Sequence, residues 1–468
     1  MTLDKGQLDR QIIEQGRRFF TLMEKNAPSI FSTERWVRGL MDWAMGRDPL
    51  KAEIFTLLDR LPGLTTEKML YDHIRQSFKH PEVLPPVLRL GLRIAGLLGP
   101  LGRKIVTAIV SKCVKIVAHQ FIIASQVDQT VSKLCKLRQK DGFAFTLDIL
   151  GEDTATDQQV GQYIEKYFQL LAGLKTAQQN WAPLANGDSL LDWGSAPKIN
   201  ISVKPSALDS HPDPDDLQAT VSRMFERLSP LYRIVVQLGG FLCIDIETRA
   251  LRRITFELYR RLRSDPQFRN YPHLGLTMQV YFKDADAELD KMLAWARVEK
   301  LPISIRLVKG AYWEYEIAAA EKARAPVPVY TIKTETDLAF ERAAQTILKN
   351  HDICHLACAS HNIRSVCSVL ALARALNVPQ NRSEFQVLYG MAESFRKALL
   401  GIAGRVRLYC PQGQLIAAMA YLVRRLIENT SSESFMHLTF AEHTDIDRLL
   451  ENPAITLDNI QTQKPPAK

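Results

Sequence analysis

The segment PISIRLVKG (residues 302–310) alternates apolar side chains with other types at every second position, as expected of a β-strand. The apolar set consists of Ile303, Ile305 and Leu307. The other set consists of Ser304, Arg306 and Val308. A helical pattern, AELDKMLAWARVEK (residues 287–300), comes immediately before the segment. We therefore predict a strand of a parallel βαβ unit. Its apolar face would contact the surrounding helices, and its other face would point to the lumen of a barrel.

Seven further segments of the same kind alternate with helical patterns. The eight predicted strands are FAFTLDILGE (143–152), KINISVKPS (198–206), FLCIDIE (241–247), LTMQVYF (276–282), PISIRLVKG (302–310), ICHLACASHN (353–362), EFQVLYG (384–390) and VRLYCP (406–411). Eight such units predict an α/β fold, a closed (β/α)₈ TIM-like barrel with its active site at the carboxyl ends of the strands. We expect residues 1–140 to form an all-helical region, residues 141–437 the barrel, and residues 438–468 a polar, mobile tail or linker.

The composition is that of an ordinary globular protein: 46% of the 468 residues are apolar and the net charge is +9. The seven cysteines are an odd number and include no CxxC pair, which favours a reducing compartment over a disulfide framework. The charged start of the chain lacks the apolar core of a signal peptide. We therefore expect a cytoplasmic protein.

Residues 81–120 combine long apolar runs with an excess of basic side chains. The uncharged run at residues 94–102 is far shorter than the ~20 residues that cross a bilayer. The sequence favours a buried pair of helices with basic ends. A transient contact with the membrane surface is the alternative, and it would place the protein peripherally on the inner face of the cell membrane. Because no aromatic residues interleave with the charges and no DNA-binding motif is present, we expect no nucleic-acid partner.

Alternation along five strands places one polar side chain of each strand on the inner wall, near the carboxyl end. These residues are Lys204, Asp245, Gln279, Arg306 and Tyr409. Burying such groups costs several kcal/mol unless they pair with one another or meet a polar ligand. A polar, ligand-binding mouth of the barrel is therefore predicted, although a frayed strand end would explain any one of these residues alone.

The helical segment QLIAAMAYLVRRLIEN (residues 414–429) carries a second group of polar side chains. Tyr421, Arg424, Arg425 and Glu428 share one helix face because they are spaced at i, i+3, i+4 and i+7. Two adjacent arginines form a fork suited to a carboxylate or a phosphate. The alternative is a solvated pair of Arg424 and Glu428.

The turn after residue 308 is a third candidate. Lys309, Gly310 and Ala311 would allow backbone N–H groups to approach a ligand, and Trp313 offers a flat ring for stacking. An ordinary strand-to-helix turn would look the same. The cluster of histidines and cysteines at residues 351–358 is not predicted to bind a metal, because alternation sends its histidine and cysteine side chains to opposite sides of a strand.

Three segments, IRLVKGAYW (305–313), EFQVLYGM (384–391) and YLVRRLIEN (421–429), resemble the flavin-dependent proline dehydrogenase domain of bacterial proline utilization A. The resemblance covers about residues 140–437, and the helical part before it is similar to the N-terminal arm and helical domain of that family. It implies a barrel that binds FAD non-covalently, oxidises L-proline to 1-pyrroline-5-carboxylate and passes electrons to a membrane quinone. A pyrroline-5-carboxylate dehydrogenase, as a fused module or a separate protein, is the implied partner.

The resemblance also implies a role for individual residues. Proline would be bound by Lys204, Asp245, Tyr312, Leu388, Tyr409, Tyr421, Arg424 and Arg425, with the two arginines on its carboxylate and Glu152 as their buried charge partner. The flavin would be bound by Gln279, Arg306, Lys309, Gly310, Ala311, Trp313, Thr331, Ile332, Lys333, Ser360, His361 and Glu428, with Arg306 near N5. Arg306, Asp245 and Lys204 would be the catalytic group.

The sequence departs from the family pattern at two positions. Ser360 stands where threonine is usual, and Tyr389 where histidine is common. We recognise neither a ribbon-helix-helix pattern at the start nor an aldehyde dehydrogenase module after residue 437. Two alternatives of other classes remain: a Schiff-base barrel aldolase using Lys204 or Lys309, and a non-catalytic basic scaffold that docks on membranes through residues 81–127.

Overall fold

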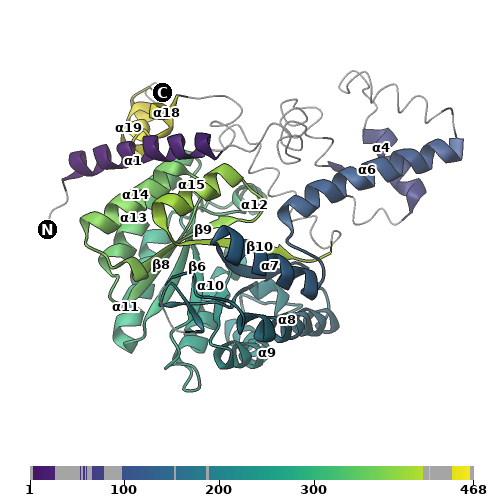
Figure 1. Ribbon diagram of the computed structural model, residues 1–468, viewed down its shortest axis with the longest axis horizontal. Helices are drawn as coiled ribbons and strands as arrows, with labels where there is room; N and C mark the ends of the chain where they lie inside the picture. Colours follow the sequence, from purple (N-terminus) through teal and green to yellow (C-terminus); the bar gives the residue numbers. More distant parts are fainter. Residues whose placement is uncertain are drawn as a thin grey trace.

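The computed structural model contains a closed barrel of eight parallel strands surrounded by helices (Figure 1). It describes residues 4–26, 66–77, 99–151, 154–185, 189–414 and 445–463, and the single residues 53, 56, 57, 60, 97 and 421. Neighbouring strands follow the order of the chain, and the last strand pairs with the first. The predicted (β/α)₈ fold is therefore confirmed.

Each of the eight predicted segments contains or overlaps one barrel strand. The strands are β1 (Ala144–Ile149), β4 (Asn200–Val203), β5 (Phe241–Ile244), β6 (Leu274–Gln279), β7 (Ile303–Val308), β8 (Cys354–Ala359), β9 (Ser383–Leu388) and β10 (Val406–Gln412). The helices around them are α8 (Asp157–Gln178), α9 (Leu217–Gln237), α10 (Arg249–Ser264), α11 (Ala285–Glu299), α12 (Trp313–Lys322), α13 (Lys333–Lys349), α14 (Ile363–Ala375) and α15 (Glu393–Ala403). Short elements β2 (Leu191–Asp192), β3 (Ala196–Pro197), η3 (Pro205–Ala207) and η4 (Gln380–Arg382) lie in the connections.

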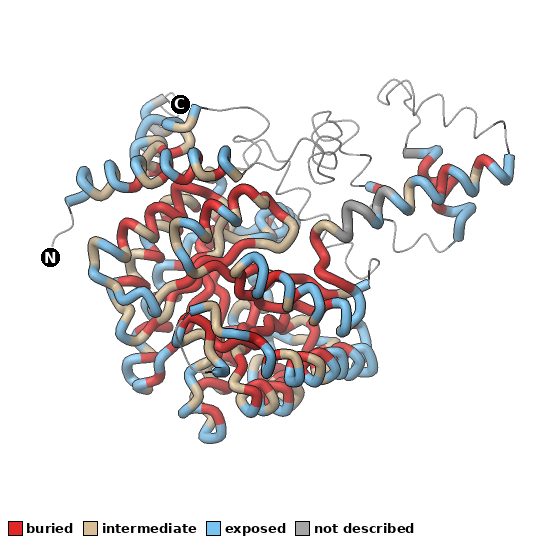
Figure 2. The backbone as a smooth tube through the Cα atoms, viewed as in Figure 1, coloured by how far each residue is buried: buried red, intermediate tan, exposed pale blue. Residues whose placement is uncertain are grey.

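The alternation read from β7 holds in three dimensions. Ile303, Ile305 and Leu307 are buried in the apolar core, which lies between the strands and the surrounding helices. The burial colouring shows this arrangement as a red centre under a mixed outer layer (Figure 2). Cys354 and Cys358 of β8 belong to the same core, whereas His355 points to the barrel interior, so the two residue types do lie on opposite sides.

The described part of the N-terminal region is helical, as predicted, and includes α1 (Lys5–Lys25), α4 (Glu67–Ser77), α6 (Gly99–Phe121) and α7 (Val127–Asp141). Helix α1 lies across α14 and α15, while α4 and α6 extend away from the barrel (Figure 1). The two extended helices pack together through residues such as Ile74 and Val106. However, α6 is not a fully buried helix, because Leu101, Ile105 and Ile109 are exposed along one side.

The C-terminal end of α6 contacts the loop after β9, at the carboxyl end of the barrel. Gln120 Nε2 donates to the carbonyl of Gly390, 3.3 Å away. Gly390 has φ +80°, and a Cβ at this position would lie 1.8 Å from the carbonyl oxygen of Gln120. Ala124, just after the helix, bridges to Gln412 of β10 in a parallel sense. Within the part of the chain that the structure describes, no helix is both long and apolar enough to span a membrane.

The C-terminal region corrects one expectation. Residues 446–463 do not form a polar, mobile tail, because they fold into α18 (Ile446–Leu449) and α19 (Pro453–Gln463). Leu450 is completely buried and packs where Gly16 of α1 leaves room for it. Arg364 of α14 donates to the carbonyl of Leu450 and to Asp9 of α1, so a single buried guanidinium joins both ends of the described chain to the barrel.

Candidate active site

A cavity of about 290 Å³ lies at the carboxyl ends of the barrel strands. Its lining includes the five residues that strand alternation places inward, namely Lys204, Asp245, Gln279, Arg306 and Tyr409. It also includes Lys309, Gly310, Ala311, Tyr312, Ser360, His361, Leu388 and Tyr421 among the other predicted residues. The volume is close to the lower end of the range typical of ligand-binding pockets, ~300–1,000 Å³.

Asp245, at the end of β5, organises one wall of this cavity. One of its oxygens forms an ion pair with Arg306 Nη1 of β7, and the other accepts a 2.7 Å hydrogen bond from the hydroxyl of Tyr409 on β10. Burial, with the nearby charges of Asp148 and Asp245, raises the pKa of Tyr409 well above its usual value. The phenol therefore stays protonated and donates to the carboxylate, which fixes the position of Asp245 between a cation and a neutral donor.

Arg306 is held by three strands at once. Its Nε donates to Gln386 Oε1 at 2.7 Å, and its Nη2 donates to Ser202 Oγ at 2.9 Å. Gln386 Nε2 in turn donates to Glu384 Oε1 at 2.6 Å, which fixes the orientation of the amide. Glu384 also forms a buried ion pair with Arg407. This second ion pair, closer to the amino-terminal end of the barrel, therefore orients Arg306 through Gln386.

Lys204 has a partner that the sequence interpretation missed. Its Nζ lies 2.6 Å from both oxygens of Asp148 on β1, and Asp148 is fully buried. The alternation used for the other strands would have found it, because Phe145, Leu147 and Ile149 form the apolar set of β1. The same rule applied to β9 would have indicated Glu384 and Gln386.

Lys309 is held by a carboxylate of the next helix. It forms an ion pair with Asp337 of α13, and Lys333 Nζ lies 3.7 Å from the same carboxylate. Lys333 does not line the cavity, and neither do Thr331 and Ile332, which precede α13. Trp313 also lies outside it: the indole is exposed and donates to the carbonyl of Tyr330 at 2.7 Å. Roles for these four residues stay predictions.

Four predicted residues fall outside the described part of the chain. They are Glu152, Arg424, Arg425 and Glu428. Within the segment 414–429, Tyr421 is described, is buried and lines the cavity.

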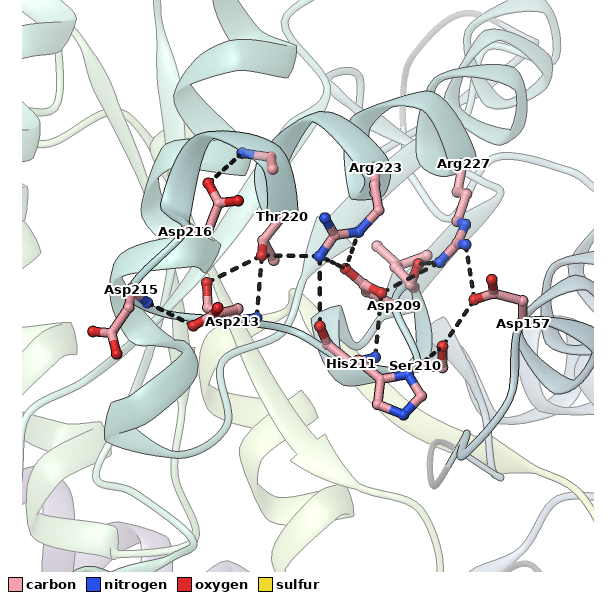
Figure 3. A network of polar contacts seen from close by, with 12 residues as sticks. Asp157, Asp209, Ser210, His211, Asp213, Asp215, Asp216, Thr220, Arg223 and Arg227 are labelled. Carbon is pink, nitrogen blue, oxygen red and sulfur yellow. Dashed lines mark hydrogen bonds and ion pairs between the residues drawn. The ribbon is translucent and has the colours of Figure 1, made fainter.

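The loop that leaves Lys204 is locked by a polar network (Figure 3). Arg223 Nε of α9 donates to Asp209 at 2.9 Å, and Arg227 donates to the carbonyl of Leu208 and to Asp157 at the start of α8. Ser210 adds a second hydrogen bond to Asp157. The network joins the loops that follow β1, the strand of Asp148, and β4, the strand that ends just before Lys204.

The cavity lining suits a planar, hydrogen-bonding cofactor. Gln279 is buried, and its Oε1 has no hydrogen-bond partner among the described residues, so it is available to accept from a ligand N–H. Gly310 has φ +143°, and a Cβ there would lie 2.6 Å from the ring of Tyr281. This glycine lets the backbone after β7 pass close to the wall. In the part of the chain that the structure describes, no group of three or more potential metal ligands is present.

A closed barrel with a polar cavity at the carboxyl ends of its strands defines a (β/α)₈-barrel enzyme. Residues 131–438 match the family model for proline dehydrogenase, and residues 9–121 match the model for the N-terminal domain of proline utilization A. The chain therefore belongs to the proline dehydrogenase family, whose members oxidise proline in the first step of its catabolism and are generally flavin-dependent.

Named relatives agree with this assignment. The bifunctional PutA protein of Klebsiella aerogenes is 26% identical over 79% of this chain, which spans 28% of the length of that relative. Proline dehydrogenase of Deinococcus radiodurans is 24% identical over 68% of this chain and 88% of its own length. The crystal structure of proline utilization A from Bdellovibrio bacteriovorus has a TM-score of 0.85 and 33% identity, over 96% of this chain and 44% of that chain.

Proposed function

We propose that this chain oxidises L-proline to 1-pyrroline-5-carboxylate, using FAD bound in the cavity at the carboxyl end of the barrel and a quinone as the final electron acceptor. The observation that carries the proposal is the group formed by Arg306, Asp245 and Tyr409 at the wall of this cavity, in a chain of the proline dehydrogenase family. When bound, the flavin supplies the acceptor for the hydride that leaves the carbon next to the ring nitrogen of proline.

The remaining residues act by binding and orientation. We assign the carboxylate of proline to Arg424 and Arg425, because adjacent guanidinium groups match its planar geometry. Lys204, Tyr312, Leu388, Tyr409 and Tyr421 would surround the ring. Asp245 keeps Arg306 in place, and Lys204 is itself held by Asp148. Substrate therefore meets charges that are already oriented, which reduces the reorganisation required during reaction.

For the cofactor, we assign Gln279, Arg306, Lys309, Gly310 and Ala311 to the ring system and pyrophosphate. Trp313, Thr331, Ile332, Lys333, Ser360, His361 and Glu428 complete the proposed set. The amide oxygen of Gln279, which has no hydrogen-bond partner among the described residues, supports this assignment, since a buried acceptor without a partner costs about 1–3 kcal/mol unless a ligand satisfies it.

The organisation of the chain follows from the same proposal. Residues 1–140 would form the arm and helical domain, and residues 141–437 the catalytic barrel. The apolar side chains exposed on α6, with basic residues such as Lys104 and Lys112 beside them, support a peripheral contact with the membrane that holds the quinone. A pyrroline-5-carboxylate dehydrogenase would use the product.

The decisive experiment is an absorbance spectrum of the purified chain, taken before and after L-proline is added without oxygen. A flavin spectrum that bleaches with proline is expected. A colourless protein that does not bind added FAD would reject the proposal. Trapping of a carbonyl substrate by borohydride would instead support a Schiff-base aldolase.

The binding roles are tested by a single change in the predicted arginine fork. Arg425→Ala should raise the KM for proline by about tenfold or more while the flavin spectrum stays normal, because one charge-assisted hydrogen bond is worth ~1.5–3 kcal/mol. Loss of flavin in this variant would show that Arg425 belongs to the cofactor site instead.

A further inference from the structure

A second cavity, of about 160 Å³, lies at the amino-terminal end of the barrel. Its rim is formed by segments that precede the strands, among them Trp193, His273, Asn381 and Arg405. We call it the lower chamber. In barrels of this kind the interior is normally filled by layers of side chains, and the amino-terminal face serves stability. A space well above the ~10–15 Å³ that one water molecule needs is therefore unexpected there.

Among the described residues, Arg306 and Gln386 are the only two that line both cavities, so these two side chains separate the lower chamber from the proposed active site. Arg306 turns its guanidinium toward Asp245 and Ser202, and Gln386 closes the layer between Arg306 and Glu384. The lower chamber is thus distinct from the proposed active site, and the exposed Asn381 is among its lining residues.

The charges of the lower chamber do not balance. Among the described residues that line it, four are arginines and one is a carboxylate: Arg306, Arg382, Arg405, Arg407 and Glu384. Arg306 is paired with Asp245, and Arg407 with Glu384. Arg405 and Arg382 are not in any ion pair within the described chain. Arg405 donates to the backbone carbonyl of Trp193, and Arg382 donates to those of His351 and Asp352.

The neutral groups of the chamber add no negative charge. Burial lowers the pKa of His273 and of His355 to about 4, so both rings are uncharged at neutral pH. Asn200 is almost completely buried, and its Oδ1 has no hydrogen-bond partner among the described residues. Among the described residues, Glu384 is the one carboxylate near Arg405 and it is already paired with Arg407, while Asn200 Oδ1 has no donor. A half-buried guanidinium without an ion pair and a buried acceptor without a donor are both costly unless something binds them.

We propose that the lower chamber is a binding site for a small carboxylate that also carries a hydrogen-bond donor, such as a short hydroxy acid. The planar fork of Arg405 matches a carboxylate, and the donor would satisfy Asn200 Oδ1. Trp193, whose ring lies 5.8 Å from the Arg405 guanidinium and 5.3 Å from that of Arg407, provides the apolar wall.

Calorimetric titration of the flavin-loaded full chain with glycolate, acetate and chloride, at constant ionic strength, tests the proposal. Glycolate should bind saturably and about fivefold more tightly than acetate, which lacks the donor for Asn200, since one neutral hydrogen bond is worth about 1 kcal/mol. Chloride binding as tight as that of glycolate would overturn the carboxylate assignment, and the absence of saturable glycolate binding would overturn the site.

Variants locate the binding. Arg405→Gln should weaken glycolate binding by at least about tenfold, whereas Arg342→Gln, which changes an exposed arginine paired with Asp286, should leave it unchanged. Lys204→Met changes only the cavity at the carboxyl ends of the strands, called the upper cavity below, and should also leave the affinity for glycolate unchanged. Unchanged affinity in Arg405→Gln, or loss of binding in Lys204→Met, would place the ligand elsewhere.

Asn200→Asp covers the case in which Arg405→Gln does not fold. The new carboxylate would supply the missing negative charge, so the variant should fold, keep or raise its melting temperature, and lose glycolate binding. A lower melting temperature would show that the chamber has no excess of positive charge, and would overturn the proposal independently of any ligand.

Discussion

The basic side chains at the two ends of the barrel have different kinds of partner. At the carboxyl end, Lys204, Arg306 and Lys309 each have a carboxylate of a neighbouring strand or helix as partner: Asp148, Asp245 and Asp337. At the amino-terminal end, Arg382 and Arg405 donate to backbone carbonyls instead. Paired cations are fixed in place before a substrate arrives, while the unpaired ones keep their charge available for a ligand. Charge pairing therefore distinguishes the proposed catalytic site from the proposed binding site in the lower chamber.

The largest effect is expected from Asp245→Ala, which removes the carboxylate shared by Arg306 and Tyr409. Breaking a buried pair leaves a charge without compensation, so the free energy of unfolding should fall by about 3–5 kcal/mol. The value of kcat/KM for proline should fall about 100-fold, because the guanidinium loses its fixed position. Urea unfolding and steady-state kinetics measure the two effects.

The matched change at the same position is Asp245→Asn, which keeps the size and one acceptor oxygen. It should destabilise the protein less than Asp245→Ala. If both variants unfold at the urea concentration of the parent protein, the pair contributes nothing to stability and the contrast between the two ends of the barrel is wrong.

The second prediction concerns Lys204→Met, which leaves Asp148 buried without its ammonium partner. A loss of about 3 kcal/mol is expected, again because a buried charge is left unpaired. Adding Asp148→Asn should restore most of the stability and none of the activity. A double-mutant cycle of unfolding free energies measures the coupling of the two residues. Additive losses would show that the two side chains do not form the pair seen in the structure.

Much of the upper cavity could be predicted because alternation along a strand is a local property. Reading it on single strands was sufficient to place Lys204, Asp245 and Arg306 on one wall. Which carboxylate each cation meets depends instead on contacts between strands: Asp148 of β1 reaches Lys204 because β1 pairs with β4, the next barrel strand along the chain. Partners across strands are thus set by tertiary structure.

The C-terminal helices show a second reason why the sequence does not predict the whole structure. Residues 446–463 are polar on average, which predicts a tail, yet Leu450 is fully buried against Gly16, more than 400 residues away in the chain. A single buried leucine has no periodicity of its own. Its environment is created by α1 and α14, so the sequence around it carries little signal.

The third prediction uses pH to examine the lower end of the barrel. Burial, with the nearby arginines, lowers the pKa of His355 to about 4, whereas the unfolded chain keeps a value near 6.5. Between pH 6.5 and 4 the unfolded state therefore binds more protons, and stability falls as the pH falls through this range. One histidine accounts for at most about 3 kcal/mol of this loss.

Replacing the imidazole of His355 tests this pH dependence of stability. His355→Gln should reduce the slope of unfolding free energy against pH by about 1.4 kcal/mol per unit between pH 6 and 4.5, and should leave the slope above pH 7 unchanged. Guanidinium unfolding at a series of pH values tests this. An equal slope in both proteins would mean that His355 is already protonated in the folded chain, and that the lower chamber tolerates yet another cation.

The smallest effect is expected at Thr156, the first residue of a capping box at the start of α8. Its hydroxyl accepts from the backbone N–H of Gln159 at 3.3 Å, and the Gln159 side chain accepts from the backbone N–H of Thr156 at 3.2 Å. Thr156→Ala should lower the free energy of unfolding by about 1 kcal/mol, and Thr156→Ser should retain most of it.

Because Asp157, the next residue, belongs to the network that fixes the loops after β1 and β4, the kinetics of Thr156→Ala sharpen the comparison further (Figure 3). If the Asp148–Lys204 pair is fixed by the strands that carry it, the KM for proline should not change with the loss of the cap. A raised KM would show instead that the position of Lys204 depends on the loops above it, and that the preorganisation of the upper cavity resides in its surface network as much as in the barrel wall.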